Sequence, residues 1–345
     1  MKNRLIKFLI LSLIFIFVIT IFTGCGSNSK KINTNEESNG NTSQKPEYVF
    51  KLGHVENEDS TWHKAFLKFA EEVNKKSNGR IEIKIYPNSQ LGSEREMIEG
   101  VQAGTMDMTM SGETLQNWAP KVGVMSALYA IRDYDQLDKV AGGEIGKEIE
   151  KEILEKTHLR PIAWFARGPR YLTSNRPIKT PDDLKGLRVR VPNVPLFVKS
   201  WEALGAKPVP MALSEVFTAL QQGTVEAQEN PLALIKSNGF YEVQKYVNKT
   251  EHVIGWIYIL IGEKQFEALP NDLQKVILDA AKDMQQYERQ LFMENEKNLA
   301  KELQDKGMEF IDVDKEAFKA KVTNTVIASL TPEQKDLYMK IINTK

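Results

Sequence analysis

A helix-forming run from Asn271 to Lys306 places the strongest constraint on how this chain folds. Its interior contains no glycine or proline, so nothing within it would end or kink a helix. At about 1.5 Å per residue the helix would extend for roughly 54 Å, which is longer than a small domain is wide. We therefore expect it to run across the back of two domains and to link them. The chain length of 345 residues also favours two domains.

Strand-like and helix-like segments alternate in the first half of the chain. Residues 48–54 form a short strand, and residues 80–86 alternate strictly between polar and apolar side chains, as a strand should. Between these strands a helix should begin near Ser60. Ser93 and Glu96 form a capping-box pattern that opens a second helix. This order predicts an α/β domain with a mainly parallel sheet.

The same alternation continues in the second half. Thr180 precedes a short helix that should end at Gly186, and Thr331 precedes a final helix. The expected strands cover residues 159–165, 187–191, 207–210, 225–228, 251–262 and 308–313. A second α/β unit follows from this pattern.

Three polar residues of the second unit stand near the ends of expected strands: Arg170, Arg190 and Asn230. Open α/β sheets bind their ligands at such positions. Arginine presents a flat fork of donors that matches a carboxylate in two parallel hydrogen bonds. The alternatives are a solvated strand arginine at Arg190 and a turn residue at Asn230, which precedes a proline. The residues predict a pocket for a small organic acid.

Other arginines and aromatic residues are interpreted more simply. We expect Arg167, Arg176 and Arg188 to be surface charges or partners at a sheet edge. The aromatic residues Phe197, Trp201 and Trp256 are assigned to the core rather than to a site, since aromatic side chains at helical spacing are more often core. His252 should support the hinge or the packing.

Several classes of protein are disfavoured by the composition. The 46 basic and 46 acidic side chains are balanced, and no basic stripe indicates nucleic-acid binding. The histidines show no metal-ligand spacing, and neither a glycine-rich phosphate loop nor a nucleophile in a recognisable setting is present. We expect no enzymatic activity, no cofactor and no metal.

The N-terminal residues have the pattern of a lipoprotein signal. Residues 1–25 consist of a basic start, an apolar stretch and a short segment that ends at Cys25, the only cysteine. We expect lipidation of Cys25, with an uncleaved membrane anchor as the alternative. Residues 26–46 are polar and should form a flexible tether that spans on the order of 25 Å. A tethered protein of this kind favours an extracytoplasmic location on a Gram-positive cell surface.

The middle of the chain resembles the solute-binding proteins of TRAP transporters, the tripartite ATP-independent uptake systems for organic acids. The matching segments are TSNRPIKTPDDLKGLRVRVPN, GAKPVP, SEVFTALQQGTVEAQENP and FYEVQKY, and the likeness extends from about Tyr48 to the C-terminus. The resemblance implies that Arg190 grips the substrate carboxylate, that Arg170 assists it and that Asn230 orients the grip.

The resemblance also implies the architecture. It predicts a two-domain α/β fold like that of periplasmic binding proteins, with a cleft between the domains and a long helix spanning both. The expected boundaries are 47–167 plus 256–295 for domain I, and 168–255 plus 296–345 for domain II. The cleft should close around the ligand by a hinge motion.

The implied function is the capture of an organic acid, most simply a sugar acid such as a uronate or aldonate, by a monomer that delivers it to the small and large membrane subunits. Sialic-acid-binding members carry glutamate and phenylalanine where Gly112 and Leu213 stand, and Glu113 should face away because neighbouring strand residues point to opposite sides. A C4-dicarboxylate, sialic acid and a sensory role for a membrane receptor are the alternatives.

Overall fold

The computed structural model describes residues 45–345, which lie within one compact unit. The predictions for residues 1–25, including Cys25, and for nearly all of the tether fall outside the described residues. The strands are β1 (Tyr48–Gly53), β2 (Ile81–Tyr86), β3 (Met108–Ser111), β4 (Leu159–Arg167), β5 (Arg170–Ser174), β6 (Arg188–Val191), β7 (Lys207–Pro210), β8 (Ala227–Pro231), β9 (Tyr246–Asn248), β10 (Gly255–Gly262) and β11 (Glu309–Ile311).

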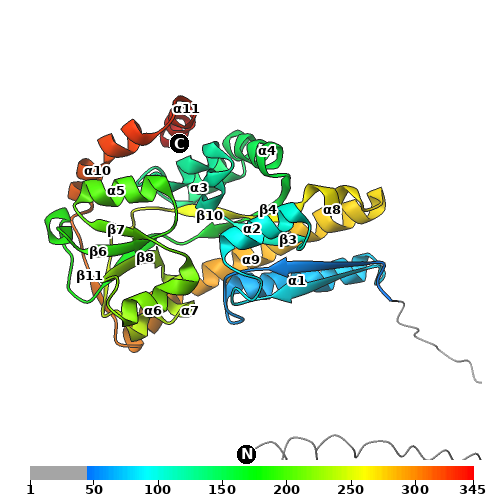
Figure 1. The fold of residues 1–345 in the computed structure, drawn as a ribbon, viewed down its shortest axis with the longest axis horizontal. Helices are drawn as coiled ribbons and strands as arrows, with labels where there is room; N and C mark the ends of the chain where they lie inside the picture. The colour runs from blue at the N-terminus through cyan, green and yellow to red at the C-terminus, as the bar shows by residue number, and fades with distance from the viewer. Residues whose placement is uncertain (1–44) are drawn as a thin grey trace, which may run out of the picture. The chain divides into compact units, whose positions relative to one another are not determined.

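The helices connect these strands and cover the sheets (Figure 1). They are α1 (Thr61–Lys76), α2 (Glu94–Ala103), α3 (Tyr134–Ala141), α4 (Glu144–Thr157), α5 (Pro195–Leu204), α6 (Val216–Gln221), α7 (Leu232–Ser237), α8 (Glu263–Glu267), α9 (Asn271–Asp305), α10 (Lys315–Ser329) and α11 (Pro332–Asn343). Short 3₁₀ helices are η1 (Glu113–Asn117), η2 (Pro120–Ser126), η3 (Pro181–Leu184), η4 (Leu213–Glu215) and η5 (Phe240–Glu242).

Two separate sheets confirm the α/β class. The first has the order β2-β1-β3-β10-β4, and α1 to α4 pack on it; we call this part the first lobe. The second has the order β11-β9-β5-β8-β6-β7 and carries α5 to α7; we call it the second lobe. Residues of both sheets line the cavity between the lobes.

The first sheet is mixed rather than mainly parallel, because β10 lies antiparallel to both β3 and β4. The chain reaches β10 from the second lobe and therefore enters the first sheet from the opposite direction. All eight residues of β10 are buried, which accounts for the continuous apolar character of this segment.

Helix starts were predicted correctly from their capping residues. The Ser60 side chain accepts a hydrogen bond from the amide of His63, and Ser93 forms a capping box with Glu96. Thr331 caps α11 in the same way. Thr180 also forms a capping box, but the segment it opens is a single 3₁₀ turn rather than an α-helix.

The long helix α9 spans 35 residues and confirms the prediction within one residue. Its side chains enter three apolar clusters: Leu273 and Ile277 pack with α1 in the first lobe, Phe292 reaches the largest cluster, and Leu299 and Leu303 pack with α6 and α7. Each end of one rigid helix is thus fixed to a different lobe, and the helix is visible as the orange element in Figure 1.

The two C-terminal helices pack on different lobes. Helix α10 packs against α5, whereas α11 packs against η2 and α4. The expected domain boundaries assigned all of 296–345 to the second domain and so did not anticipate that α11 contacts the first lobe. The boundaries themselves stay a prediction. Within residues 45–345, every helix is too short or too polar to cross a membrane.

Candidate functional site

A cavity of about 290 Å³ lies between the lobes and contains all three predicted ligand residues. Its volume lies near the lower end of the range of roughly 300–1,000 Å³ that is typical of small-molecule sites. The second lobe contributes Arg170, Arg190, Met211 and Asn230, and the first contributes Glu56, Trp62, Ser93, Glu94, Gly112, Glu113 and Arg167.

Strand order brings the three predicted residues together. Strand β8 lies between β5 and β6, with Tyr171 opposite Asn230 and Arg190 opposite Gln228. Arg190 and Asn230 lie near the carboxyl ends of β6 and β8, as expected. Arg170 begins β5 rather than ending a strand, but β5 is antiparallel to β8, so its start meets the same sheet edge.

Arg190 is a buried cation held by a neutral group. It is 3% exposed, and its Nε and Nη2 both donate to the backbone carbonyl of Met211, at 3.1 and 2.7 Å. Burial lowers the pKa of the guanidinium to about 10. A carbonyl carries no net charge, so this anchor orients the guanidinium without neutralising it.

Arg170, in contrast, is neutralised within the protein. Its Nη2 donates to Glu229 Oε1 at 2.7 Å and its Nε to Glu229 Oε2 in a fork-shaped ion pair. Burial opposes the charge on Arg170, yet Glu229, together with Glu113 and Glu94, outweighs burial and raises the pKa of this guanidinium. The ring of Phe197 lies 5.3 Å from the guanidinium carbon.

Asn230 is fixed by hydrogen bonds on both ends of its amide. Its Oδ1 accepts from Arg170 Nη2 at 3.2 Å, and its Nδ2 donates to Gln228 Oε1 at 2.6 Å. The geometry matches a residue that orients Arg170.

Glu229 and His252 complete this buried network, and neither was among the predicted site residues. Burial would raise the pKa of Glu229, but Arg170 and His252 hold it at about 2. Because an ionised carboxylate only accepts hydrogen bonds, we assign the His252 proton to Nε2, which lies 2.9 Å from Glu229. The ring Nδ1 then accepts from the Thr250 hydroxyl at 2.9 Å. His252 is buried and packs against Trp201, and its role in the hinge stays a prediction.

The first lobe presents an acidic wall to the arginines. Glu94 Oε1 accepts from Ser111 Oγ at 2.5 Å and from the Gly112 amide at 3.3 Å. Glu113 accepts from Arg167 Nη1 at 2.7 Å, in a buried ion pair. The charge of Glu94 acts on the pKa of both Arg170 and Arg190.

One prediction about this wall was wrong. Glu113 does not face away from the cleft, because β3 ends at Ser111 and η1 turns the Glu113 side chain towards it. Arg167, expected to be a surface charge or a partner at a sheet edge, is not on the surface: it ends the edge strand β4, is 9% exposed and lines the cleft. Arg188 is a surface charge, as expected, since its side chain is 46% exposed and pairs with Glu226.

The aromatic residues assigned to the core are there: Phe197, Trp201 and Trp256 are each 0% exposed. Among residues 45–345, no group of three or more histidine, cysteine or acidic side chains could hold a metal ion.

Two lobes, a buried cleft and a cluster of buried arginines define a protein that binds a small solute. The family comparison agrees: the model named DctP, described as bacterial extracellular solute-binding protein, family 7, matches residues 52–330. The chain belongs to this family, the solute-binding proteins of TRAP transporters.

Proteins with a known ligand are similar to this chain in sequence and structure. Solute-binding protein RD1_1052 of Roseobacter denitrificans is 51% identical over 83% of this chain and 88% of its own length. Its crystal structure with bound L-galactonate has a TM-score of 0.85 at 49% identity, covering 87% of this chain and all of that one. The 2,3-diketo-L-gulonate-binding periplasmic protein YiaO of Escherichia coli is 32% identical over 80% of this chain and 85% of its own.

A further solved structure extends the series. A TRAP periplasmic solute-binding protein from Haemophilus influenzae with bound L-gulonate has a TM-score of 0.81 at 34% identity, and covers 86% of this chain and all of that one.

Proposed function

We propose that this protein captures a sugar acid with a single carboxylate, such as an aldonate or uronate, and that Arg190 binds that carboxylate with help from Arg170 and Asn230. The observation that carries the proposal is the difference between the two arginines. Arg170 has its counter-ion in Glu229, whereas Arg190 is held by a neutral carbonyl at the cleft wall. A buried charge without a counter-ion is costly, so a ligand carboxylate would supply what Arg190 lacks.

The ligands of the relatives fit this chemistry. L-Galactonate, L-gulonate and 2,3-diketo-L-gulonate, the ligands of those three proteins, each combine one carboxylate with several hydroxyl groups. A carboxylate clamp opposite a wall of hydrogen-bond acceptors would suit such molecules.

The acidic wall separates sugar acids from dicarboxylates. Glu94 and Glu113 lie across the cleft from the arginines, and their carboxylates accept hydrogen bonds from sugar hydroxyls. Glu113 is already paired with Arg167, so a second ligand carboxylate would meet like charge mainly at Glu94, and such repulsion is a means of rejecting a competitor. The C4-dicarboxylate alternative is therefore the weaker one.

The packing at Gly112 leaves little room for the glutamate that sialic-acid-binding members carry at this position. A Cβ at this position would lie 3.2 Å from Ile257 Cγ2 and 3.4 Å from Arg167 Nη1. A side chain at this position would require Ile257 to shift slightly and would lie in contact with Arg167.

The clamp alone would not provide tight binding. Each hydrogen bond to a charged group contributes roughly 1.5–3 kcal/mol, whereas micromolar affinity requires about 8 kcal/mol. Closure of the lobes would add contacts from the first-lobe wall. The closed protein would then deliver the acid, chemically unchanged, to the small and large membrane subunits of a TRAP transporter; presentation to a sensory receptor would use the same site.

We also propose that the protein is a monomer anchored outside the cytoplasm by a lipid on Cys25, on a Gram-positive surface, with residues 26–46 as the tether. The sequence around Cys25 supports this. Replacing Cys25→Ser should abolish labelling by a fatty-acid precursor. Unchanged labelling would contradict the lipid anchor.

The test of the clamp is a binding titration of aldonates, uronates, sialic acid and C4-dicarboxylates by calorimetry. We expect one class of sugar acid to bind, and Arg190→Met to weaken binding at least about 100-fold, since the loss of two charged hydrogen bonds corresponds to roughly 3–6 kcal/mol. Arg188→Met, on the same strand but exposed, is the matched control and should bind normally. Equal binding by Arg190→Met and the wild type would refute the clamp.

A further inference from the structure

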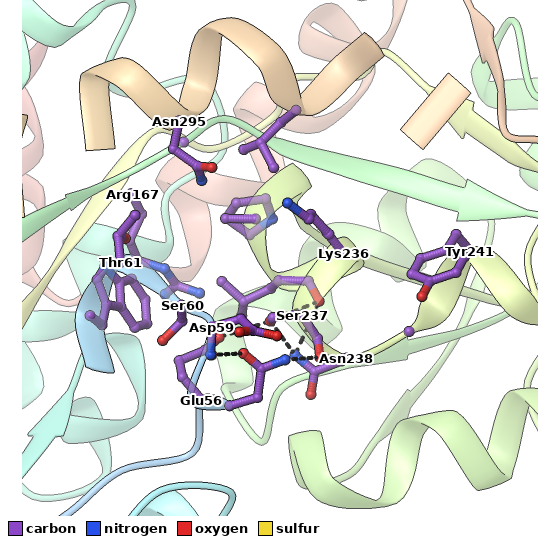
Figure 2. Close-up of a pocket in the computed structure, with 18 of the residues that line it drawn as sticks. Glu56, Asp59, Ser60, Thr61, Arg167, Lys236, Ser237, Asn238, Tyr241 and Asn295 are labelled. Carbon is purple, nitrogen blue, oxygen red and sulfur yellow. Dashed lines mark hydrogen bonds between the residues drawn. The ribbon is translucent and has the colours of Figure 1, made fainter. Parts of the chain in front are cut away.

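A second cavity, of about 510 Å³, lies between the same two lobes beside α9 (Figure 2). Residues 56–62 at the end of β1 and the start of α1 form its first-lobe side, and residues 231–242 around α7 form its second-lobe side. Phe292, Asn295 and Leu299 of α9 line it from a third direction. Figure 2 shows the amide of Asn295 directed from α9 into this space.

A polar bridge joins the two lobes in the wall of this cavity. Asn57 Nδ2 donates to the Ser237 carbonyl at 2.7 Å, and the Ser237 hydroxyl donates to Glu56 Oε2 at 2.9 Å. Both bonds join the first lobe to the second. The two cavities share a wall, because four residues line both of them: Glu56, Trp62, Arg167 and Leu234.

Glu56 leaves part of its hydrogen-bonding capacity unused in this wall. The residue is 2% exposed, and its Oε1 has no partner within residues 45–345. A buried acceptor without a donor is unfavourable. A ligand hydroxyl is one group that would satisfy it, and burial also raises the pKa of this carboxyl to about 7.

The charges around the second cavity balance. Three acidic side chains (Glu56, Asp59 and Glu242) and three basic ones (Arg167, Lys236 and Lys306) line it. Arg167 is paired with Glu113, and Lys236 with Glu302. Both partner carboxylates lie outside the cavity lining, so the lining offers little free positive charge to an anionic ligand.

The remaining lining groups are hydroxyls, amides and aromatic surfaces. Ser60, Thr61 and Tyr241 supply hydroxyls, and Asn295 supplies an amide. The rings that line the cavity are those of Trp62, Phe217, Tyr241 and Phe292. Hydrogen-bonding groups set among apolar rings fit a molecule that has hydroxyl groups on an uncharged carbon skeleton.

We propose that the second cavity binds a neutral polyol or monosaccharide and that this ligand strengthens binding of the sugar acid. The proposal rests on the proposed function, because it assigns the first cavity to a sugar acid. A molecule that contacts Glu56 and Asn238 at once bridges the two lobes, and thus favours the arrangement in which the arginines face the acidic wall. Linkage requires the effect to be mutual: the sugar acid must strengthen binding of the polyol by the same factor.

The experiment measures each ligand alone and both together on the full chain. Galactitol, D-glucitol, myo-inositol and D-galactose are the neutral probes, and the sugar acid is the one selected by the titration described above. We expect at least one neutral probe to raise the melting temperature alone, and to increase sugar-acid affinity at least about fivefold, the lower end of common coupling.

Variants on α9 distinguish the cavity from general solvent effects. Asn295→Leu should abolish the melting shift and the coupling, while sugar-acid affinity without the probe stays within about twofold of wild type. Asn298→Leu makes the same change at an exposed position of the same helix and should leave both effects intact. Circular dichroism establishes that each variant is folded.

The outcomes separate this proposal from the proposed function. Sugar-acid binding without any response to a neutral probe would overturn the second site alone. A melting shift with galactitol but no binding of any sugar acid would overturn the proposed function and the coupling, and leave a polyol site. Coupling that survives Asn295→Leu would show that the probe acts elsewhere.

Discussion

The same substitution at two neighbouring arginines should have different effects on the stability of the ligand-free protein. Arg170 and Arg190 are both at least 97% buried, at 2% and 3% exposure. Glu229 neutralises Arg170, whereas a carbonyl holds Arg190. We predict that Arg170→Met strongly destabilises the protein and that Arg190→Met does not.

The magnitudes follow from the contacts. A guanidinium pKa of about 10 instead of 12.5 corresponds to a cost of about 3 kcal/mol for holding the Arg190 charge in the folded state. Arg190→Met removes that cost but leaves the Met211 carbonyl without these donors, a loss of roughly 1–3 kcal/mol. The net change should lie between zero and about 2 kcal/mol in favour of the variant. Arg170→Met leaves the buried Glu229 carboxylate without its counter-ion, with His252 as its remaining side-chain partner, which should cost roughly 3–5 kcal/mol.

Urea unfolding at neutral pH, followed by circular dichroism, measures both free energies of unfolding. Bound ligand must first be removed by unfolding, dialysis and refolding, since a ligand on the wild type would add to its stability. Arg188→Met is the control for the change of residue type. Comparable losses of stability in Arg170→Met and Arg190→Met, with unchanged denaturant slopes, would refute the assignment of one neutralised and one unneutralised arginine.

Two further predictions test other parts of the protein. Glu94→Gln removes one negative charge from the acidic wall, so the affinity for a C4-dicarboxylate relative to a sugar acid should rise at least about tenfold by calorimetry; an unchanged ratio would show that the wall does not repel dicarboxylates. Burial raises the pKa of Glu288 on α9 to about 8, so the folded protein holds this proton more tightly than the unfolded chain does. The resulting stability is fully present below about pH 4.5 and is lost as the pH rises through about 8; unfolding measured across this range should show a smaller loss in Glu288→Gln.

Local signals in the sequence predicted much of the fold. Ser60, Ser93 and Thr331 cap helices because each side chain lies close in sequence to the amide it accepts from. The length of α9 followed from the absence of glycine and proline. The direction of β10 could not be predicted in this way, because it depends on which lobe the chain has left before it enters the first sheet.

The site was predictable to the extent that it lies on strands of one lobe. Arg170, Arg190 and Asn230 meet at one sheet edge because β5, β6 and β8 are neighbours. Glu229 is the residue before Asn230, but its pairing with Arg170 and His252 depends on contacts between distant segments. The pairing of Arg167 with Glu113 has the same origin: it joins the end of β4 to η1, which lie far apart in sequence.

The position of β10 also bears on the order in which the chain is made and folded. Its neighbours β3 and β4 are complete by Arg167, but β10 begins at Gly255, after β5 to β9 have been synthesised. Until then β3 and β4 lack their shared partner, and the first sheet stays open in the middle. In a member of an extracellular family, this delay would keep the N-terminal part of the chain from folding prematurely during export, because its sheet is closed by a strand that arrives late.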